Sequence, residues 1–164
     1  MVRMFQPSDM NQVLSLAREQ IREAGVEDML PVDDVYFTKT VKNILIKPNM
    51  QLFVVEDGQD IVGYALIGVT TKVWNPTAYS IVHYFFVHPS VRNPYKADAL
   101  FQSCVQFSRE QGCRFMEIGV SLFDKDYGVS KHYVDRASKF YEAKHCEYTG
   151  DNYVYNLEDG KWAA

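Results

Sequence analysis

Runs of apolar residues in the middle of the chain predict a buried strand followed by a helix. Ser80–Val87 is almost entirely apolar and rich in β-branched and aromatic side chains, which is typical of a strand covered on both faces. His88 and Pro89 end this run. Beyond them, apolar residues recur at helical spacing until Gly112, at Ala97, Leu100, Phe101, Cys104 and Val105. The turn between strand and helix is a candidate anion site, because a helix N-terminus carries partial positive charge.

The residues before this unit predict two helices and three strands. The first helix is expected to begin at Ser8 or Asp9 and to end before Gly25, and the second to begin at Asp33 or Asp34. Three stretches have the apolar character of strands, and an Asp-Gly turn joins the last two: Val2–Phe5, Met50–Glu56 and Ile61–Val73. The last two strands and the central strand are therefore expected to form an antiparallel meander.

The residues after the central helix predict another strand, a helix and a closing hairpin. Arg114–Val120 follows a helix, so it is expected to lie parallel to Ser80–Val87 through a right-handed crossover. The last helix is expected over Ser130–Ala143, and the hairpin pairs His145–Thr149 with Tyr153–Leu157. The predicted fold class is α/β, with a mixed, mostly antiparallel twisted sheet flanked by helices. Residues 1–164 are expected to form a single domain.

Composition excludes several classes of function. The net charge is −4 and no run of Lys or Arg occurs, so we expect no nucleic-acid partner. No stretch approaches the ~20 apolar residues of a membrane helix, and the first residues do not resemble a signal peptide. The three cysteines have no metal-ligand spacing and their number is odd, which predicts reduced thiols, a cytoplasmic protein and no metal.

The turn after the central strand resembles a known motif. Val87-His88-Pro89-Ser90-Val91-Arg92, with Ala97 and Leu100, is similar to the central motif of the GNAT acyltransferase superfamily. In that superfamily the loop amides hold the pyrophosphate of acetyl-CoA. The order of predicted elements also matches the GNAT order, so the resemblance extends over nearly the whole chain. It implies the GNAT fold, acetyl-CoA as cosubstrate, and a set of cofactor-binding residues: Phe86, Val87, Arg92, Asn93, Tyr95, Lys96 and Ala97.

The loop departs from the GNAT pattern at two positions. Tyr95 stands where the superfamily has its first glycine, and Pro94 lacks an N–H donor. Asn93 and Pro94 also favour a helix N-cap and a first helical residue. A helix capped in this way needs no ligand, so both interpretations of the loop stay open.

The resemblance also implies two catalytic residues. His83 lies on the strand that carries the acetyl group in the superfamily, and imidazole is suited to proton transfer near neutral pH. Tyr141 follows Ala137 as in the superfamily's last helix, and its hydroxyl could protonate a leaving thiolate. Val134 and His145-Cys146 depart from the pattern of that helix. The structural alternatives are a histidine hydrogen-bonded within the sheet and a core tyrosine.

The resemblance therefore implies an N-acetyltransferase that moves acetyl from acetyl-CoA to a primary amine by direct attack. The acceptor is expected to be a small-molecule or peptide amine. Because members of the superfamily often dimerise, a homodimer is one expected assembly. The alternative is a GNAT-fold protein that binds or interacts without catalysis.

Overall fold

A computed structural model of the chain describes residues 1–119, 131–149 and 152–157. The strands are β1 (Val2–Met4), β2 (Met50–Asp57), β3 (Asp60–Lys72), β4 (Asn75–Val87), β5 (Phe115–Gly119), β6 (Glu147–Tyr148) and β7 (Asn152–Asn156). The α-helices are α1 (Met10–Ala24), α2 (Asp34–Leu45), α3 (Pro94–Glu110) and α4 (Lys131–Ala143). The predicted ends of a strand at Val120 and of a helix at Ser130 lie outside the described residues, as does most of the last hairpin turn.

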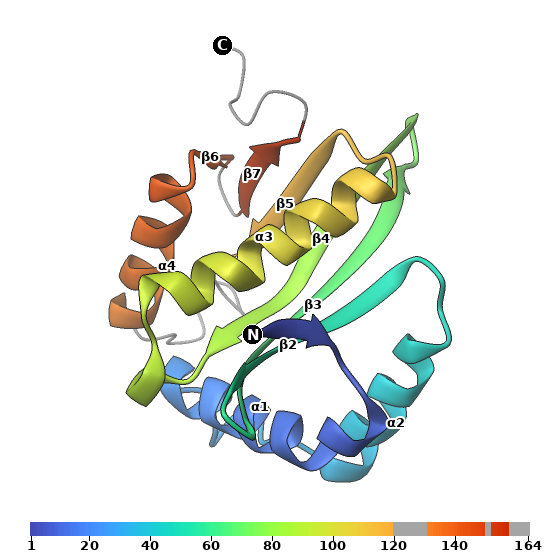
Figure 1. The fold of residues 1–164 in the computed structure, drawn as a ribbon. Coiled ribbons are helices and arrows are strands. Elements are labelled where there is room, and N and C mark those ends of the chain that lie inside the picture. Colours follow the sequence, from blue (N-terminus) through green and yellow to red (C-terminus); the bar gives the residue numbers. More distant parts are fainter. Residues whose placement is uncertain (120–130, 150–151, 158–164) are drawn as a thin grey trace.

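The strands form one sheet in the order β1-β2-β3-β4-β5-β7-β6 (Figure 1). β2, β3 and β4 are antiparallel neighbours, which confirms the predicted meander. β5 pairs in parallel with β4, and β6 and β7 form the antiparallel closing hairpin. The predicted fold class is therefore confirmed. β4 begins at Asn75, five residues before the predicted start at Ser80, because its polar first residues extend the pairing with β3.

Each face of the sheet carries its own apolar core. α1 and α2 cover one face, where residues such as Leu52, Leu66 and Phe86 are buried. α3 and α4 cover the other face, where Phe101 and Met116 are fully buried. Because β4 has residues in both cores, the direction of each of its side chains is fixed by packing.

At α1 and α2, the predicted helix ends are confirmed with one exception. Gly25 follows α1 with a φ of 76°, a conformation that glycine adopts without steric cost, and the Asp33 carboxylate accepts a hydrogen bond from the Tyr36 N–H at the start of α2. Asp9 does not cap α1. It is buried before the helix, in a 3-10 turn over Pro7–Asp9.

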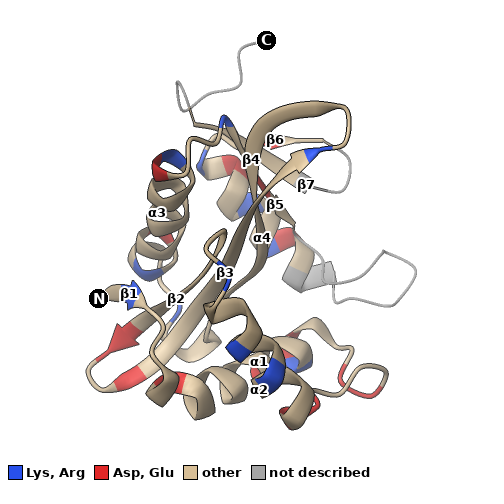
Figure 2. Cartoon of the chain, turned by 90° about the vertical axis from the view of Figure 1, so that its right-hand side faces the viewer, with Lys and Arg blue, Asp and Glu red and all other residues tan. Residues whose placement is uncertain are grey.

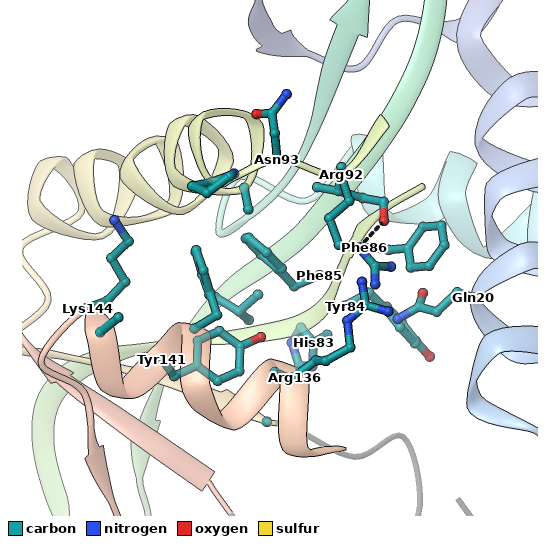
Figure 3. Close-up of a pocket in the computed structure, with 18 residues that line it drawn as sticks. Gln20, His83, Tyr84, Phe85, Phe86, Arg92, Asn93, Arg136, Tyr141 and Lys144 are labelled. Atoms are coloured by element: carbon teal, nitrogen blue, oxygen red, sulfur yellow. Dashed lines mark hydrogen bonds between the residues drawn. The ribbon is translucent and has the colours of Figure 1, made fainter. Parts of the chain in front are cut away.

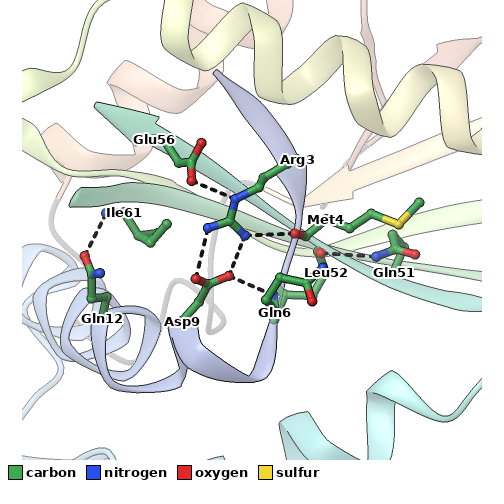
Figure 4. Close-up of polar contacts among 9 residues, drawn as sticks. All are labelled: Arg3, Met4, Gln6, Asp9, Gln12, Gln51, Leu52, Glu56 and Ile61. Carbon is green, nitrogen blue, oxygen red and sulfur yellow. Dashed lines mark hydrogen bonds and ion pairs between the residues drawn. The ribbon is translucent and has the colours of Figure 1, made fainter. Parts of the chain in front are cut away.

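Asp9 instead joins β1 to the first turn of the chain (Figure 4). Its carboxylate accepts two hydrogen bonds from the Arg3 guanidinium and one from the Gln6 N–H. The same guanidinium donates to Glu56 of β2. The pKa of the Asp9 carboxyl is lowered mainly by the hydrogen bonds from Arg3. This ion-pair network fixes the edge of the sheet far from the site described below.

Charged residues are mixed over the surface (Figure 2). Lys and Arg alternate with Asp and Glu on the helices and at strand ends, as in the pairs Arg18–Asp34 and Arg22–Glu19 on α1 and α2. No helix in the described part of the chain is both long enough and apolar enough to cross a membrane.

A β-bulge in β4 determines where the two central strands separate. Leu66 of β3 is opposite Tyr84 and Ile67 is opposite Val82, so His83 is the extra residue. The parallel pairing of β4 with β5 extends from Tyr79 only to Val82. Among the described residues, β4 continues past this point without pairing to β5, and the cavity described below lies there.

The bulge also breaks the alternation of side chains between His83 and His88. The extra residue changes the parity of the strand, so the alternation does not apply across it. His88 itself lies beyond β4, where it caps a 3-10 turn over Pro89–Val91 and its Nδ1 is 2.7 Å from the Ser90 hydroxyl.

Candidate active site

A cavity of about 450 Å³ lies beside β4 and is called the central cavity below. Its walls come from β4 after Val82, from the start of α3, from α4 and from Gln20 of α1 (Figure 3). Seven of the nine predicted site residues line it: His83, Phe86, Val87, Arg92, Asn93, Ala97 and Tyr141. Tyr95 and Lys96 do not line it. The chain thus brings both predicted catalytic side chains to one cavity.

His83 projects from the bulge beside the neighbouring strand. A Cβ at Gly68 of β3 would lie 3.2 Å from His83 Nε2, so the glycine leaves room for the imidazole. The residue is exposed, and the protein atoms around the ring displace part of its hydration. This partial desolvation lowers the pKa of His83 below its usual value of 6.5. The direction of the shift favours the neutral imidazole, which can accept a proton.

Tyr141 enters the cavity from α4 inside an aromatic cluster. Its side chain is 3% exposed and contacts the rings of Phe85, Phe140 and Tyr153 at centroid distances of 6.3, 5.5 and 5.4 Å. In Figure 3 its hydroxyl points into the cavity on the side where His83 lies. The aromatic packing holds the tyrosine ring in one orientation, with its hydroxyl directed toward the cavity.

The end of β4 is held close to β3. A Cβ at Gly63 would lie 2.7 Å from the Phe86 carbonyl oxygen, so only glycine allows this approach. The Val87 carbonyl accepts a hydrogen bond of 2.8 Å from Arg92 Nε. The carbonyl at the strand end is therefore satisfied by a side chain of the following loop.

Arg92 also forms a bidentate ion pair with α1. Its Nη1 and Nη2 donate to the two carboxylate oxygens of Glu23 at 2.7 and 2.6 Å. Glu23 is 16% exposed in its side chain, and Arg136 of α4 approaches the same carboxylate at 3.4 Å. One carboxylate thus links α1, the loop before α3, and α4.

The start of α3 has the capped form. The Asn93 side chain accepts a hydrogen bond of 2.9 Å from the Lys96 N–H, Pro94 is the first helical residue, and the Ala97 N–H is 3.3 Å from the Asn93 carbonyl oxygen. Tyr95 is 85% exposed, and the Lys96 ammonium pairs with Asp57 of β2. The Asn93 cap, one of the two interpretations from sequence, is present.

Several residues at the cavity escaped the sequence analysis. Gln20 and Glu23 lie on α1, more than a hundred residues before Arg136, and each of the three resembles an ordinary helix residue in sequence. Lys144 lines the cavity just after Tyr141 and pairs with Asp98 of α3. Nothing in the spacing of these residues signals that the fold brings them together.

Thiol and metal chemistry find no support in the described residues. Burial raises the pKa values of Cys104 and Cys146 to about 12, so neither forms a thiolate readily at neutral pH. Within residues 1–119, 131–149 and 152–157, no group of three His, Cys, Asp or Glu side chains is placed to hold a metal ion.

Comparisons with known proteins agree with this geometry. Residues 13–145 match the Acetyltransferase (GNAT) family. The fold resembles an N-acetyltransferase from Staphylococcus aureus Mu50, with a TM-score of 0.69, 19% identity, and coverage of 96% of this chain and 98% of that chain. It also resembles AAC(6')-Iy in complex with a CoA-containing bisubstrate analog, with a TM-score of 0.67, 15% identity, and 87% coverage of both chains.

A third similar structure is described as a regulator of transcription and not as an acetyltransferase. A transcriptional regulator from Bacillus halodurans C-125 matches with a TM-score of 0.69 and 18% identity, over 92% of this chain and 95% of that chain. A search of curated proteins gives no significant match. At these identities the solved structures show the fold alone, whereas the family match covers most of the sequence. The chain belongs to the GNAT acetyltransferase family.

Proposed function

We propose that the protein is an N-acetyltransferase that moves an acetyl group from acetyl-CoA to a primary amine by direct attack. The observation that supports this most is the meeting of His83 and Tyr141 at one cavity, beside the point where β4 and β5 separate. A proton acceptor and a proton donor on the walls of one cavity are what acyl transfer to an amine requires.

The reaction needs two proton movements and no covalent enzyme intermediate. The amine nitrogen attacks the thioester carbonyl carbon, the C–N bond forms, and the C–S bond breaks. His83 takes a proton from the amine, directly or through water, and its lowered pKa keeps it ready to do so. Tyr141 gives its hydroxyl proton to the departing thiolate. Both groups return to their starting states when the proton passes back through solvent.

The donor's arm is proposed to lie along β4 in the central cavity, where Phe86, Val87 and Ala97 would contact it. The acceptor would approach on the side of His83 and Gln20, between β4 and α1. An amine acceptor is consistent with the bisubstrate analog bound to AAC(6')-Iy, which carries an acetylneamine portion. A small-molecule amine and a peptide amine both remain within this proposal, as does a homodimer in the cytoplasm.

The first test is thermal unfolding with and without acetyl-CoA. A ligand at ~100 times its dissociation constant adds about 2.7 kcal/mol to the folded state, which shifts the Tm by several degrees in a domain of this size. Turnover on a panel of primary amines then tests catalysis, through release of the free thiol. A shift with turnover supports the proposal, and the absence of both contradicts it.

A second function is favoured by the capped start of α3. The Lys96 N–H already donates to the Asn93 side chain, so it is not available to a phosphate. In this alternative the protein keeps the fold as a binding module and does not transfer an acetyl group. This alternative predicts no thiol release with any amine, and no loss of partner binding when Tyr141 is replaced by Phe.

A further inference from the structure

The capped helix and its neighbouring ion pairs suggest how a donor is recognised. We infer that the protein recognises its donor through the pantetheine arm and not through the phosphates of the nucleotide. The inference rests on the proposed function, since it concerns the same central cavity. It predicts that acetyl-CoA is bound less than about thirtyfold more tightly than a thioester of pantetheine alone.

The backbone at the start of α3 has little left to offer a phosphate. Of its first four residues, Pro94 has no N–H, the Lys96 N–H donates to the Asn93 side chain, and the Ala97 N–H donates to the Asn93 carbonyl. Only the Tyr95 N–H has no acceptor among the described hydrogen bonds. A pyrophosphate, which carries several acceptor oxygens, would meet one N–H of the first helical turn, beside the N–H and the side-chain amide of Asn93.

The cations beside α3 are already paired with carboxylates. The Arg92 guanidinium donates three hydrogen bonds, two to the Glu23 carboxylate and one to the Val87 carbonyl, and its side chain is 23% exposed. The Lys96 ammonium pairs with Asp57, and the Lys144 ammonium with Asp98. An incoming phosphate would have to compete with three carboxylates, and competition of this kind lowers the net gain from each contact.

The walls of the central cavity suit an uncharged arm. Phe85, Phe86, Val87, Ala97 and Phe140 give them a largely apolar character, and they connect the start of α3 with His83 and Tyr141. The pantetheine arm consists of methylene and amide groups and carries the reactive thioester at its end. The lining also includes three cations, Arg92, Arg136 and Lys144, and each of them faces a carboxylate of the protein. Mainly apolar walls are typical of sites that bind such ligands by burial.

The decisive experiment compares the dissociation constants of acetyl-CoA and S-acetyl-pantetheine for the full chain by calorimetry at one salt concentration. We expect acetyl-CoA to bind less than about thirtyfold more tightly. Thirtyfold corresponds to about 2 kcal/mol, which is roughly one charge-assisted hydrogen bond, such as one from the Tyr95 N–H, the one N–H of the first helical turn without a described acceptor. A larger preference for acetyl-CoA would overturn the inference.

A variant at the cap tests the cause. Asn93→Gly removes the side-chain acceptor and frees the Lys96 N–H, while glycine remains an acceptable N-cap. We expect the preference for acetyl-CoA over S-acetyl-pantetheine to rise about tenfold, the effect of one new hydrogen bond to a phosphate oxygen. Asp33→Gly removes the equivalent cap from α2, far from the cavity, and should leave the preference unchanged. An unchanged preference in Asn93→Gly would show that the cap does not limit phosphate recognition.

The same data separate this inference from the proposed function. Binding of acetyl-CoA with a large preference over the pantetheine thioester contradicts only the inference. Binding of neither donor contradicts both. Comparable binding of the two donors, followed by thiol release in the presence of an amine, supports both.

Discussion

The two ends of the central cavity use their polar groups in opposite ways. At the β4 bulge, His83 and Tyr141 present polar atoms to the cavity. At the start of α3, Arg92, Asn93 and Lys96 are engaged with Glu23, with the helix backbone and with Asp57. The second end is arranged to hold the protein together, whereas the first is the end at which the proposed function places the reaction.

This difference shows that a residue can match the sequence motif and still have a structural role. Arg92 matches the GNAT pattern in sequence, but its hydrogen bonds connect the end of β4 to α1. The arginine at this motif position therefore has a structural role that does not depend on ligand binding. The measurements below test whether the two ends differ as the geometry indicates.

The largest effect is expected from Tyr141→Phe. Removal of the hydroxyl takes away the proposed donor to the thiolate, so we expect kcat to fall by about 10²–10³-fold. The affinity for acetyl-CoA should change little, because the ring and its aromatic contacts remain. Tyr148→Phe, which alters a half-exposed tyrosine of β6, is the matched control. Equal losses in kcat and in donor affinity would contradict the acid role.

His83→Gln should lower kcat/KM by about 10²-fold, since a proposed base is lost while the side-chain size is nearly kept. In the unsubstituted protein kcat/KM should fall only when the pH drops below about 6.5, because partial desolvation lowers the pKa of His83. This acidic limb should disappear in the variant. An acidic limb that persists unchanged would assign the ionisation to another group.

Glu23→Gln tests whether the ion pairs at the start of α3 stabilise the fold. Loss of the charge weakens the bidentate pair with Arg92, and we expect the free energy of unfolding to fall by about 2 kcal/mol, between the values for exposed and buried pairs. Urea unfolding measures this change. The control is Glu19→Gln, whose ion pair with Arg22 is more exposed and should contribute less than about 0.5 kcal/mol.

The Glu23→Gln variant also tests whether Arg92 at the start of α3 can bind a phosphate once its carboxylate partner is lost. Release of Arg92 from Glu23 should raise the preference for acetyl-CoA over S-acetyl-pantetheine, since the guanidinium becomes available to a phosphate. A preference that stays the same, with lower stability, would show that Arg92 serves only the fold.

The smallest effect is expected at His145, just after α4. Its φ of 59° lies in the left-handed region, which is strained for a residue with a Cβ. His145→Gly should stabilise the protein by about 1 kcal/mol and raise the Tm by about 2–4 °C. His145→Ala retains the Cβ and should give no such gain. Destabilisation by glycine would mean that the imidazole makes a favourable contact that outweighs the strain.

The sequence predicted most of the fold because the apolar patterns were strong. The buried run Ser80–Val87, the helical stripe from Ala97 and the Asp-Gly turn each place an element correctly. The Asn93 cap was also predictable, since capping depends on residues three positions apart. The departure from the motif at His145, where the superfamily has a glycine, is strained, because the conformation there is one that glycine prefers.

The site was less predictable because it depends on distant contacts. The bulge at His83 has no local signature, as neither histidine nor its neighbours mark an extra residue in a strand. Glu23 lies 69 residues before Arg92, and only the packing of α1 beside the strand end brings them together. The roles of His83 and Tyr141 stay predictions, although both residues line the cavity.

The bulge shifts by one residue the alternation of side chains between the two faces of β4. Before it, Val82 faces the core under α3, and after it Phe85 and Val87 face that same core while Phe86 faces the other. Without this bulge, a regular strand of the same length would turn every later side chain to the other side, and both cores would receive the wrong residues. Deletion of His83, by contrast, would make Val82 and Tyr84 consecutive opposite Ile67 and Leu66, so the pairing of β3 with β4 would become regular. Loss of this one residue should therefore remove the imidazole and still leave Phe85, Phe86 and Val87 on the sides where they now pack.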